Sequence, residues 1–290
     1  MKEFKITSYA LARSFLALGA IITLLGSGKS VLFDKHYFDV QKPLLKWNFF
    51  HLFGYENTNW SIGIASLILF CVIIGIYPRI IGIFQWWISI SIFHIVTLSE
   101  GGDQIAVILT FLLIPLTLYD KRRNHWFGSY NPSKYTVGRI VLLLISIQMS
   151  VLYFDAAIGK FGEPEWANGT AFYYWATNNG FSEQGVLSLL LSKILVNKWI
   201  VAIFTWGAIF LELMLAMAIF IENKKTKMFF LIAGLAFHFT IIVIFGLISF
   251  FLAMAAGILL YLTPINQDLS LLWKQVFCSQ SYNSQTIHNS

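Results

Sequence analysis

Long apolar runs recur along the whole chain, and short polar or charged stretches separate them. A membrane-spanning helix needs about 20 mostly apolar residues to cross a hydrocarbon core of about 30 Å. The pattern therefore predicts an all-α integral membrane protein, a bundle of about eight transmembrane helices. The expected spans are 9–25, 60–77, 80–98, 104–119, 136–158, 199–221, 228–245 and 247–262.

Three of these segments leave alternatives open. The segment 104–119 has a short apolar core and also fits a tilted or half-buried helix. The segment 247–262 follows the preceding one almost directly, so seven spans or a re-entrant pair are the alternatives to eight. The first run follows a charged N-terminus, as in a signal peptide, but Arg13 inside it and a weak small-residue site after it favour a retained span.

The composition agrees with a membrane protein, because 57% of the residues are hydrophobic and 12% are charged, whereas soluble domains carry about 25% charged residues. We expect one polytopic transmembrane domain over 1–265. The polar segment 266–290 is expected to be a cytoplasmic tail, disordered towards its end. Cys71 and Cys278 lie in a span and in this tail, so no structural disulfide or thiol redox motif is expected.

The net charge of +6 reports topology rather than nucleic acid as a partner, because lysine and arginine gather in cytoplasmic loops. With the N-terminus inside, the basic residues of the termini and short loops fall in alternate connections, whereas the short loops 99–103 and around Gly246 contain none. Long loops are left out of this count, because they translocate largely regardless of charge. We therefore expect a multi-pass protein of the cell membrane with both termini inside. The two long aromatic-rich connections, 26–59 and 159–198, are then extracytoplasmic, and the site is expected at the outer face. The basic residues of the expected cytoplasmic segments are Lys2, Lys5, Arg79, Lys121, Arg122, Arg123, Lys134, Lys224, Lys225, Lys227 and Lys274.

The ionisable residues of interest within the expected spans are Arg13, His94, Asp155, Glu212 and His238. A charged side chain that faces lipid costs several kcal/mol, so such residues point into the bundle and find partners. Arg13 and Glu212 are expected to form a buried ion pair. This pair either contributes to a site or only holds helices together, and His238 is either a site residue or a hydrogen-bonded core histidine.

The loop 99–105 is a tight glycine turn that opens the fourth expected span. Asp103 either caps the free amides of that helix or, together with Glu100, joins a polar pocket on the side of Asp155 and Lys160.

The segment 153–175 passes from an apolar span through an acid and a lysine into a patch of aromatic residues and glycines. Lys160 either reaches the lipid headgroups or acts as a desolvated general base. The aromatic residues, Trp166 and Tyr173 among them, either form an interfacial belt or line a binding site.

Other chemical signatures are missing from the sequence. The histidines lack ligand-spaced partners, so no metal site is expected, and neither a phosphate-binding glycine loop nor a Ser/His/Asp arrangement is found. No cofactor is indicated by the residues alone. The charged cluster 120–126 is expected to be a stop-transfer and headgroup anchor.

Several of these segments resemble the SdpB family, the membrane component of sporulation-delaying-protein toxin systems in Gram-positive bacteria. The similarity lies in 99–106 (SEGGDQIA), 115–126 (PLTLYDKRRNHW), 166–174 (WANGTAFYY) and 238–250, and it covers about 60–265. The resemblance implies help in converting a secreted antimicrobial peptide precursor into mature toxin, together with a small SdpA-like companion protein.

That family resembles in turn the broader HTTM domain, which includes vitamin K-dependent gamma-glutamyl carboxylase. The carboxylase motif is similar to residues 156–173, and it implies that Lys160 is the base that deprotonates a quinol cofactor. It includes Trp166 and Gly169.

We therefore expect a membrane protein that matures a peptide toxin, and whether it is itself catalytic is open. The alternatives are a quinol-dependent carboxylase-like enzyme and a non-enzymatic toxin transport or immunity protein. The candidate catalytic residues are Lys160, Asp155, Glu212 and His238, and the candidate binding residues are Arg13, His94, Glu100, Asp103, Trp166, Gly169 and Tyr173.

Overall fold

The computed structural model describes residues 3–27, 29–41, 46–96, 101–177 and 195–275. Throughout these ranges the regular structure is helical, apart from three isolated backbone bridges. The long helices are α1 (Ser8–Gly26), α4 (Thr58–Ile73), α5 (Pro78–Ile95), α6 (Gly101–Tyr119), α7 (Thr136–Lys160), α11 (Lys198–Met217), α12 (Lys224–Phe245) and α13 (Ile248–Leu262). The short ones are α2 (Lys29–Leu32), α3 (Lys35–Gln41), α8 (Pro164–Ala167), α9 (Ala171–Thr177) and α14 (Leu269–Trp273), with 3-10 turns at Phe50–Leu52, Tyr55–Asn57, Pro132–Lys134 and Ala218–Phe220.

Each of the eight expected spans coincides with one of the long helices. Within the described residues, six are long and apolar enough to cross a membrane, which confirms the prediction of an all-helical, multi-pass membrane protein. The other two are α13, an apolar helix of 15 residues, and α5, which carries Arg79, Gln85 and His94. A count of eight spans remains a prediction.

The ends of the long helices have identifiable causes. The side chains of Thr7, Asn197 and Asn223 each accept a hydrogen bond from a free backbone N–H in the first turn of α1, α11 and α12. Helix α12 stops at Gly246, whose φ of 71° is the left-handed conformation that glycine adopts without strain.

The chain forms two compact units. Unit 1 comprises residues 1–145 and 248–290, and unit 2 comprises residues 146–247. Helix α7 begins in unit 1 and ends in unit 2, and each unit is described separately below.

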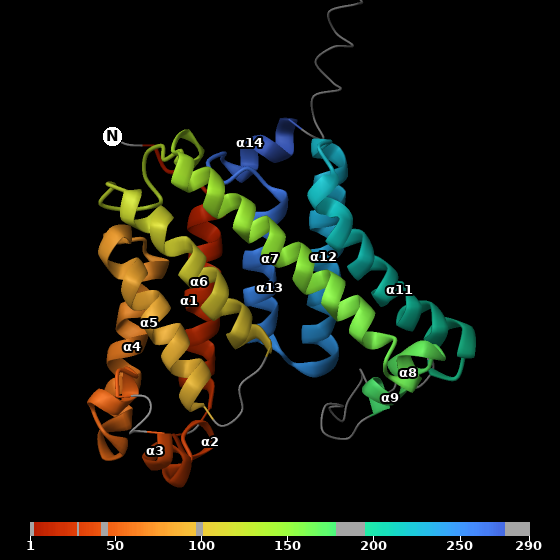
Figure 1. Cartoon of the computed structure of the whole chain (residues 1–290), viewed down its shortest axis with the longest axis horizontal. Coiled ribbons are helices and arrows are strands. Elements are labelled where there is room, and N and C mark those ends of the chain that lie inside the picture. Colours follow the sequence, from red (N-terminus) through yellow and green to blue (C-terminus); the bar gives the residue numbers. More distant parts are fainter. Residues whose placement is uncertain (1–2, 28, 42–45, 97–100, 178–194, 276–290) are drawn as a thin grey trace, which may run out of the picture. The chain divides into compact units, whose positions relative to one another are not determined.

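Helix α1 lies at the centre of unit 1, packed against α13 and α4, while α6 packs against α5 and α13 (Figure 1). Small residues allow these close approaches. A Cβ at Gly82 would stand 2.6 Å from the Thr117 hydroxyl, and one at Gly102 would stand 2.7 Å from the backbone of Phe250.

Four segments meet at one end of unit 1. The Lys5 amide donates to the Trp126 carbonyl at 2.8 Å, and the Tyr77 amide donates to the Arg123 carbonyl at 2.8 Å. The Leu269 amide donates to the Ile6 carbonyl at 2.9 Å. The N-terminal segment, the α4–α5 turn, the loop after α6 and the start of α14 therefore share this end of unit 1, and basic side chains accompany all four.

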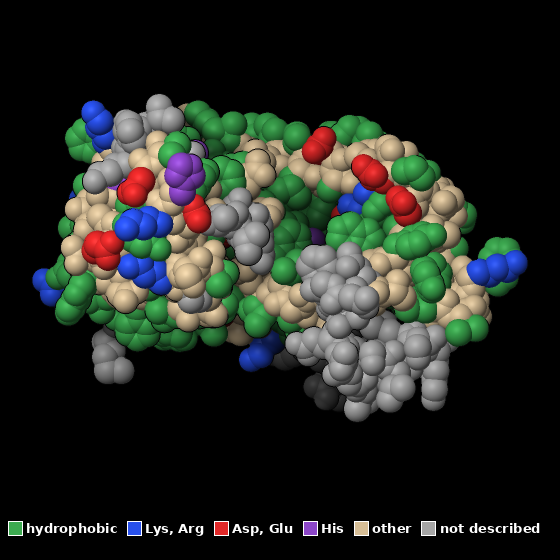
Figure 2. Space-filling view, turned by 90° about the horizontal axis from the view of Figure 1, so that it is seen from below, with side chains coloured by type: hydrophobic (Ala, Val, Ile, Leu, Met, Phe, Trp, Pro, Cys, Tyr) green, Lys and Arg blue, Asp and Glu red, His purple; other side chains and the backbone are tan. Residues whose placement is uncertain are grey.

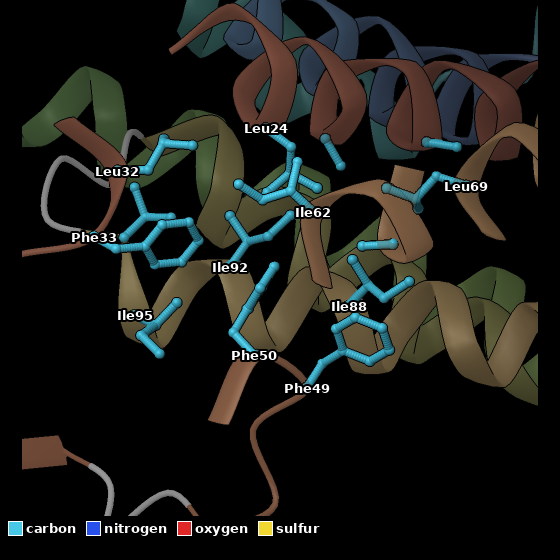
Figure 3. Close-up of a cluster of buried hydrophobic side chains, with 14 of the residues drawn as sticks. Leu24, Leu32, Phe33, Phe49, Phe50, Ile62, Leu69, Ile88, Ile92 and Ile95 are labelled. Carbon is cyan, nitrogen blue, oxygen red and sulfur yellow. The ribbon is translucent and has the colours of Figure 1, made fainter. Parts of the chain in front are cut away.

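The connection between α1 and α4 folds over the other end of unit 1. Phe33, Phe38, Phe49 and Phe50 are buried there in a cluster with apolar side chains of α1, α4 and α5 (Figure 3). The side-chain amide of Asn48 donates to the backbone carbonyl of Ser91 on α5 at 2.9 Å and so holds the connection against the bundle.

Unit 2 contains the C-terminal part of α7 with α8, α9, α11 and α12. Large apolar side chains such as Ile203, Phe210 and Phe229 are more than half exposed on its helices. Apolar side chains make up much of the visible surface of the protein (Figure 2), as expected where lipid is the solvent.

Candidate functional site

Lys160 and Glu212 form a buried ion pair in unit 2. Lys160 is the last residue of α7, and its Nζ lies 2.8 and 2.9 Å from the two carboxylate oxygens of Glu212 on α11. The same Nζ donates to the Ala156 carbonyl at 3.0 Å. The side chains are 19% and 7% exposed, so the lysine has limited access to the surroundings and the glutamate almost none.

This pairing corrects one expectation. The sequence pattern predicts that Glu212 pairs with Arg13, but Glu212 binds Lys160, and Arg13 binds a residue of its own unit. Span depth alone cannot predict the partner, because the rotation of each helix decides which side chains face each other.

Trp166 lies next to this ion pair. Helix α8 follows α7 after a short turn and places the indole ring 5.1 Å from the Lys160 Nζ, within cation–π distance. The aromatic ring and the carboxylate thus hold the ammonium group from two sides, which restricts its position.

Tyr153 and His238 form a second polar contact in unit 2. The Tyr153 hydroxyl lies 3.0 Å from His238 Nε2, and both side chains are buried. Tyr153 precedes Lys160 by two helical turns, so both lie on one face of α7. The positive charge of Lys160 lies close enough to His238 for the two side chains to interact electrostatically. Side chains from α7, α11 and α12 therefore form one polar group inside an otherwise apolar unit.

Gly169 and Tyr173 belong to the segment that returns towards α11. Gly169 has a φ of 82°, and a Cβ there would stand 3.0 Å from the ring of Trp206. The Phe172 amide donates to the Thr205 hydroxyl of α11 at 3.0 Å. Tyr173 is exposed and packs edge-on against Tyr174.

Other predicted residues lie outside this group. Asp155 is exposed and makes no ion pair with any described residue. His94 is exposed on α5 of unit 1. Asp103 lines a small cavity of unit 1, together with Ser89 and Ser249. Glu100 lies outside the described residues.

Arg13 takes part in a separate buried cluster in unit 1. Its Nη1 donates to His125 Nδ1 at 3.0 Å, and its backbone carbonyl accepts from the side-chain amide of Gln85 at 2.9 Å. Asp120 and His125 are both 0% exposed, and Asp120 binds Arg122 through both oxygens at 2.9 Å. The expectation of a headgroup anchor is therefore wrong for Asp120 and His125, because both side chains are buried.

The electrostatics of this loop follow from its burial. Burial, together with the positive charges of Arg13 and Arg122, lowers the pKa of His125 from 6.5 to about 2. Burial likewise raises the pKa of the Tyr130 hydroxyl. His125 is therefore neutral at physiological pH, and its Nδ1 serves as an acceptor.

Two curated proteins of Bacillus subtilis (strain 168) are similar to the chain over nearly its whole length. Sporulation-delaying protein SdpB is 35% identical over 273 residues, which cover 92% of this chain and 84% of that protein. The chain belongs to the SdpB family. The uncharacterized protein YitO is 34% identical over 282 residues, which cover 92% of this chain and 90% of YitO.

Membership of the SdpB family rests on these full-length similarities, because no protein-family profile matches the sequence. No solved structure matches either. The aligned part spans most of both units, so the SdpB family shares more than the loops that suggested it. HTTM membership is neither supported nor opposed by these similarities.

The geometry also reveals residues in buried polar contacts that the sequence pattern did not single out. Tyr153 shares a helix face with Lys160, and their seven-residue spacing was the available signal. His125 lies in the charged cluster 120–126, for which the sequence pattern favours a headgroup anchor. Among the described residues, no group of side chains is arranged to hold a metal ion.

Proposed function

We propose that this protein takes part in the maturation of a secreted antimicrobial peptide toxin of the sporulation-delaying type, at the outer face of the cell membrane. The observation that carries the proposal is the buried Lys160–Glu212 pair in a chain that is 35% identical to SdpB. A buried ion pair costs desolvation energy, and in a small polar group with limited access it suits binding or chemistry.

The orientation is part of the proposal. The four segments that meet at one end of unit 1 carry basic residues, which favours a cytoplasmic location for that end and for both termini. Helix α7 starts after the loop at this end and has 25 residues, about 37 Å at 1.5 Å per residue. That length supports a position for Lys160 at the outer side of the membrane.

The roles follow from the side-chain chemistry. The Lys160 ammonium can bind a carbonyl or carboxylate group of a precursor peptide, while Glu212 and Trp166 hold it in place. Tyr153, two turns before Lys160 on α7, and its contact His238 on α12 can donate or accept a proton. The partners are the precursor peptide, which reaches the site from the outer side, and a small SdpA-like companion protein.

The proposal is tested by producing the precursor and the companion protein in a host with this protein or a variant. Mass spectrometry then measures mature peptide and unprocessed precursor. We expect Lys160→Ala and Glu212→Gln to reduce mature peptide, while the exposed matched controls Lys198→Ala and Glu222→Gln leave it unchanged. Normal peptide levels from site variants that accumulate in membranes would overturn the proposal. Protection of toxin-sensitive cells by this protein alone would instead support an immunity function.

A second candidate is quinol-dependent carboxylation, favoured by the position of Lys160 where the resemblance expects a base. As an ion pair, Lys160 carries a proton, so it would first have to pass that proton to Glu212. This candidate predicts that glutamate residues of the peptide gain the mass of one CO2 each, because a carboxyl group replaces a side-chain hydrogen, and only when a reduced quinone is present. A mature peptide with unmodified glutamates would exclude it.

A further inference from the structure

The guanidinium group of Arg13 has one edge without a partner. The residue is 1% exposed on α1, and its Nη1 is bonded to His125. Neither Nε nor Nη2 makes a well-formed hydrogen bond to a protein group in the part of the chain that the structure describes, although the Tyr9 hydroxyl lies close enough to interact with the guanidinium group. These two nitrogens form one side of the planar group, the side that can grip an anion with two N–H donors.

The surrounding residues leave the charge of Arg13 uncompensated. Asp120 is the single buried acid among the described residues of unit 1, and both of its oxygens bind Arg122. His125 is neutral at physiological pH, because its pKa is about 2, so it supplies no counter-charge for Arg13. One buried positive charge therefore remains, which costs several kcal/mol without a counter-charge.

The neighbourhood of Arg13 restricts what can supply that counter-charge. Tyr9 covers one side, with its ring centroid 5.6 Å from the guanidinium carbon, and the His125 ring packs edge-on against Tyr9. Gln85 fixes the backbone of Arg13 from α5. Because Arg13 is buried by α1, α5 and the loop after α6, a headgroup or a peptide side chain of a partner does not reach it.

We infer that Arg13 binds a small monovalent anion of the chloride type, gripped by Nε–H and Nη2–H inside unit 1. Its charge matches the single uncompensated positive charge, and a monatomic ion needs little room. By neutralising Arg13, the bound ion stabilises the end of unit 1 where Arg13 of α1 binds His125 of the loop after α6. This site is separate from the Lys160–Glu212 pair and does not depend on toxin maturation.

The test uses the full chain in detergent at neutral pH, in sodium chloride or in sodium gluconate of equal ionic strength. Chloride is expected to raise the thermal midpoint by a few degrees, with saturation, because a ligand of the native state stabilises it. Gluconate is too large for the buried site. Arg13→Gln is expected to remove the chloride effect, whereas the matched control Arg139→Gln, an exposed arginine on α7, keeps it.

A direct measurement keeps the test valid even if Arg13→Gln does not fold. The wild-type protein is expected to broaden the ³⁵Cl NMR line of chloride, and bromide is expected to reverse the broadening by competition. Equal midpoints in chloride and gluconate together with an unbroadened line would overturn the inference. A chloride effect that persists in folded Arg13→Gln would also overturn it, because the ion would then bind elsewhere.

Discussion

The Nζ of Lys160 lies 2.8 and 2.9 Å from the two carboxylate oxygens of Glu212, although 52 positions separate these residues in the sequence. The contact joins the end of α7 to the C-terminal part of α11 and buries a charge pair in an apolar unit. Such a pair contributes little net stability compared with apolar residues of similar size, but removal of one partner alone is costly.

Glu212→Gln is expected to destabilise the protein. The variant leaves the Lys160 ammonium without its anion, at a cost of about 3 kcal/mol, the low end for breaking a buried pair, because the lysine is partly exposed. The thermal midpoint in detergent measures this effect. Glu222→Gln, at an exposed position after α11, should leave the midpoint unchanged, and a Glu212→Gln midpoint equal to wild type would contradict the prediction.

Tyr153→Phe removes the hydroxyl that contacts His238 and leaves the ring in place. Loss of one buried hydrogen bond is expected to lower stability by about 1 kcal/mol. Tyr174→Phe is the matched control, because Tyr174 is exposed on α9. If Tyr153 also takes part in toxin maturation, its variant lowers the peptide yield more than its small loss of stability accounts for. Equal yields from both variants would limit Tyr153 to a structural role.

Gly169→Ala is expected to destabilise the α8–α9 segment by about 1 kcal/mol or more, because alanine is strained at φ 82° and its Cβ would press on Trp206. Gly207→Ala on α11 is the control. A Cβ at Gly207 meets no atom within 4 Å, so that change should stabilise the helix by roughly 0.5–1 kcal/mol. Thermal midpoints and limited proteolysis measure whether Gly169→Ala lowers stability and Gly207→Ala raises it.

His125 makes stability depend on pH. Its pKa is about 2 in the folded protein and 6.5 in an unfolded chain, so the unfolded state binds the extra proton between these values. The stabilisation is complete above pH 6.5 and declines as the pH falls below it, by up to about 1.4 kcal/mol per pH unit. Thermal midpoints at pH 7.5, 6 and 5 should therefore decrease.

His125→Asn should flatten this decrease, because asparagine does not titrate. His36→Asn, at an exposed position on α3, should keep the wild-type slope. Equal slopes in wild type and His125→Asn would show that other groups cause the acid sensitivity.

The sequence pattern predicts the helices well, because an apolar run of membrane length has few alternatives to a helix. The sequence pattern also identifies Lys160 and Glu212 as candidates, since charged residues in or beside apolar runs are costly and rarely incidental. It identifies Trp166 through the aromatic segment that follows Lys160. The partner of Glu212 does not follow, because hydrophobic runs without a clear polar face do not fix helix rotation.

Two further features can be recognised only from the three-dimensional contacts and not from the sequence. Residues 120–126 are expected from the sequence to be a stop-transfer and headgroup anchor, yet Asp120 and His125 are buried because the loop returns onto α1 and the end of α4. The division into two units is also invisible in the sequence, since it falls within α7 and between α12 and α13, where the apolar pattern is continuous.

The most direct test of the proposed function separates pairing from chemistry at Lys160 and Glu212. In the double variant Lys160→Met/Glu212→Met both charges are removed together, so neither remains buried alone, and the fold should tolerate the change. We expect wild-type accumulation in membranes and a thermal midpoint within a few degrees of wild type, but a fall of roughly ten-fold or more in mature peptide by mass spectrometry. Wild-type levels of mature peptide from this folded variant would contradict a role for the pair in toxin maturation.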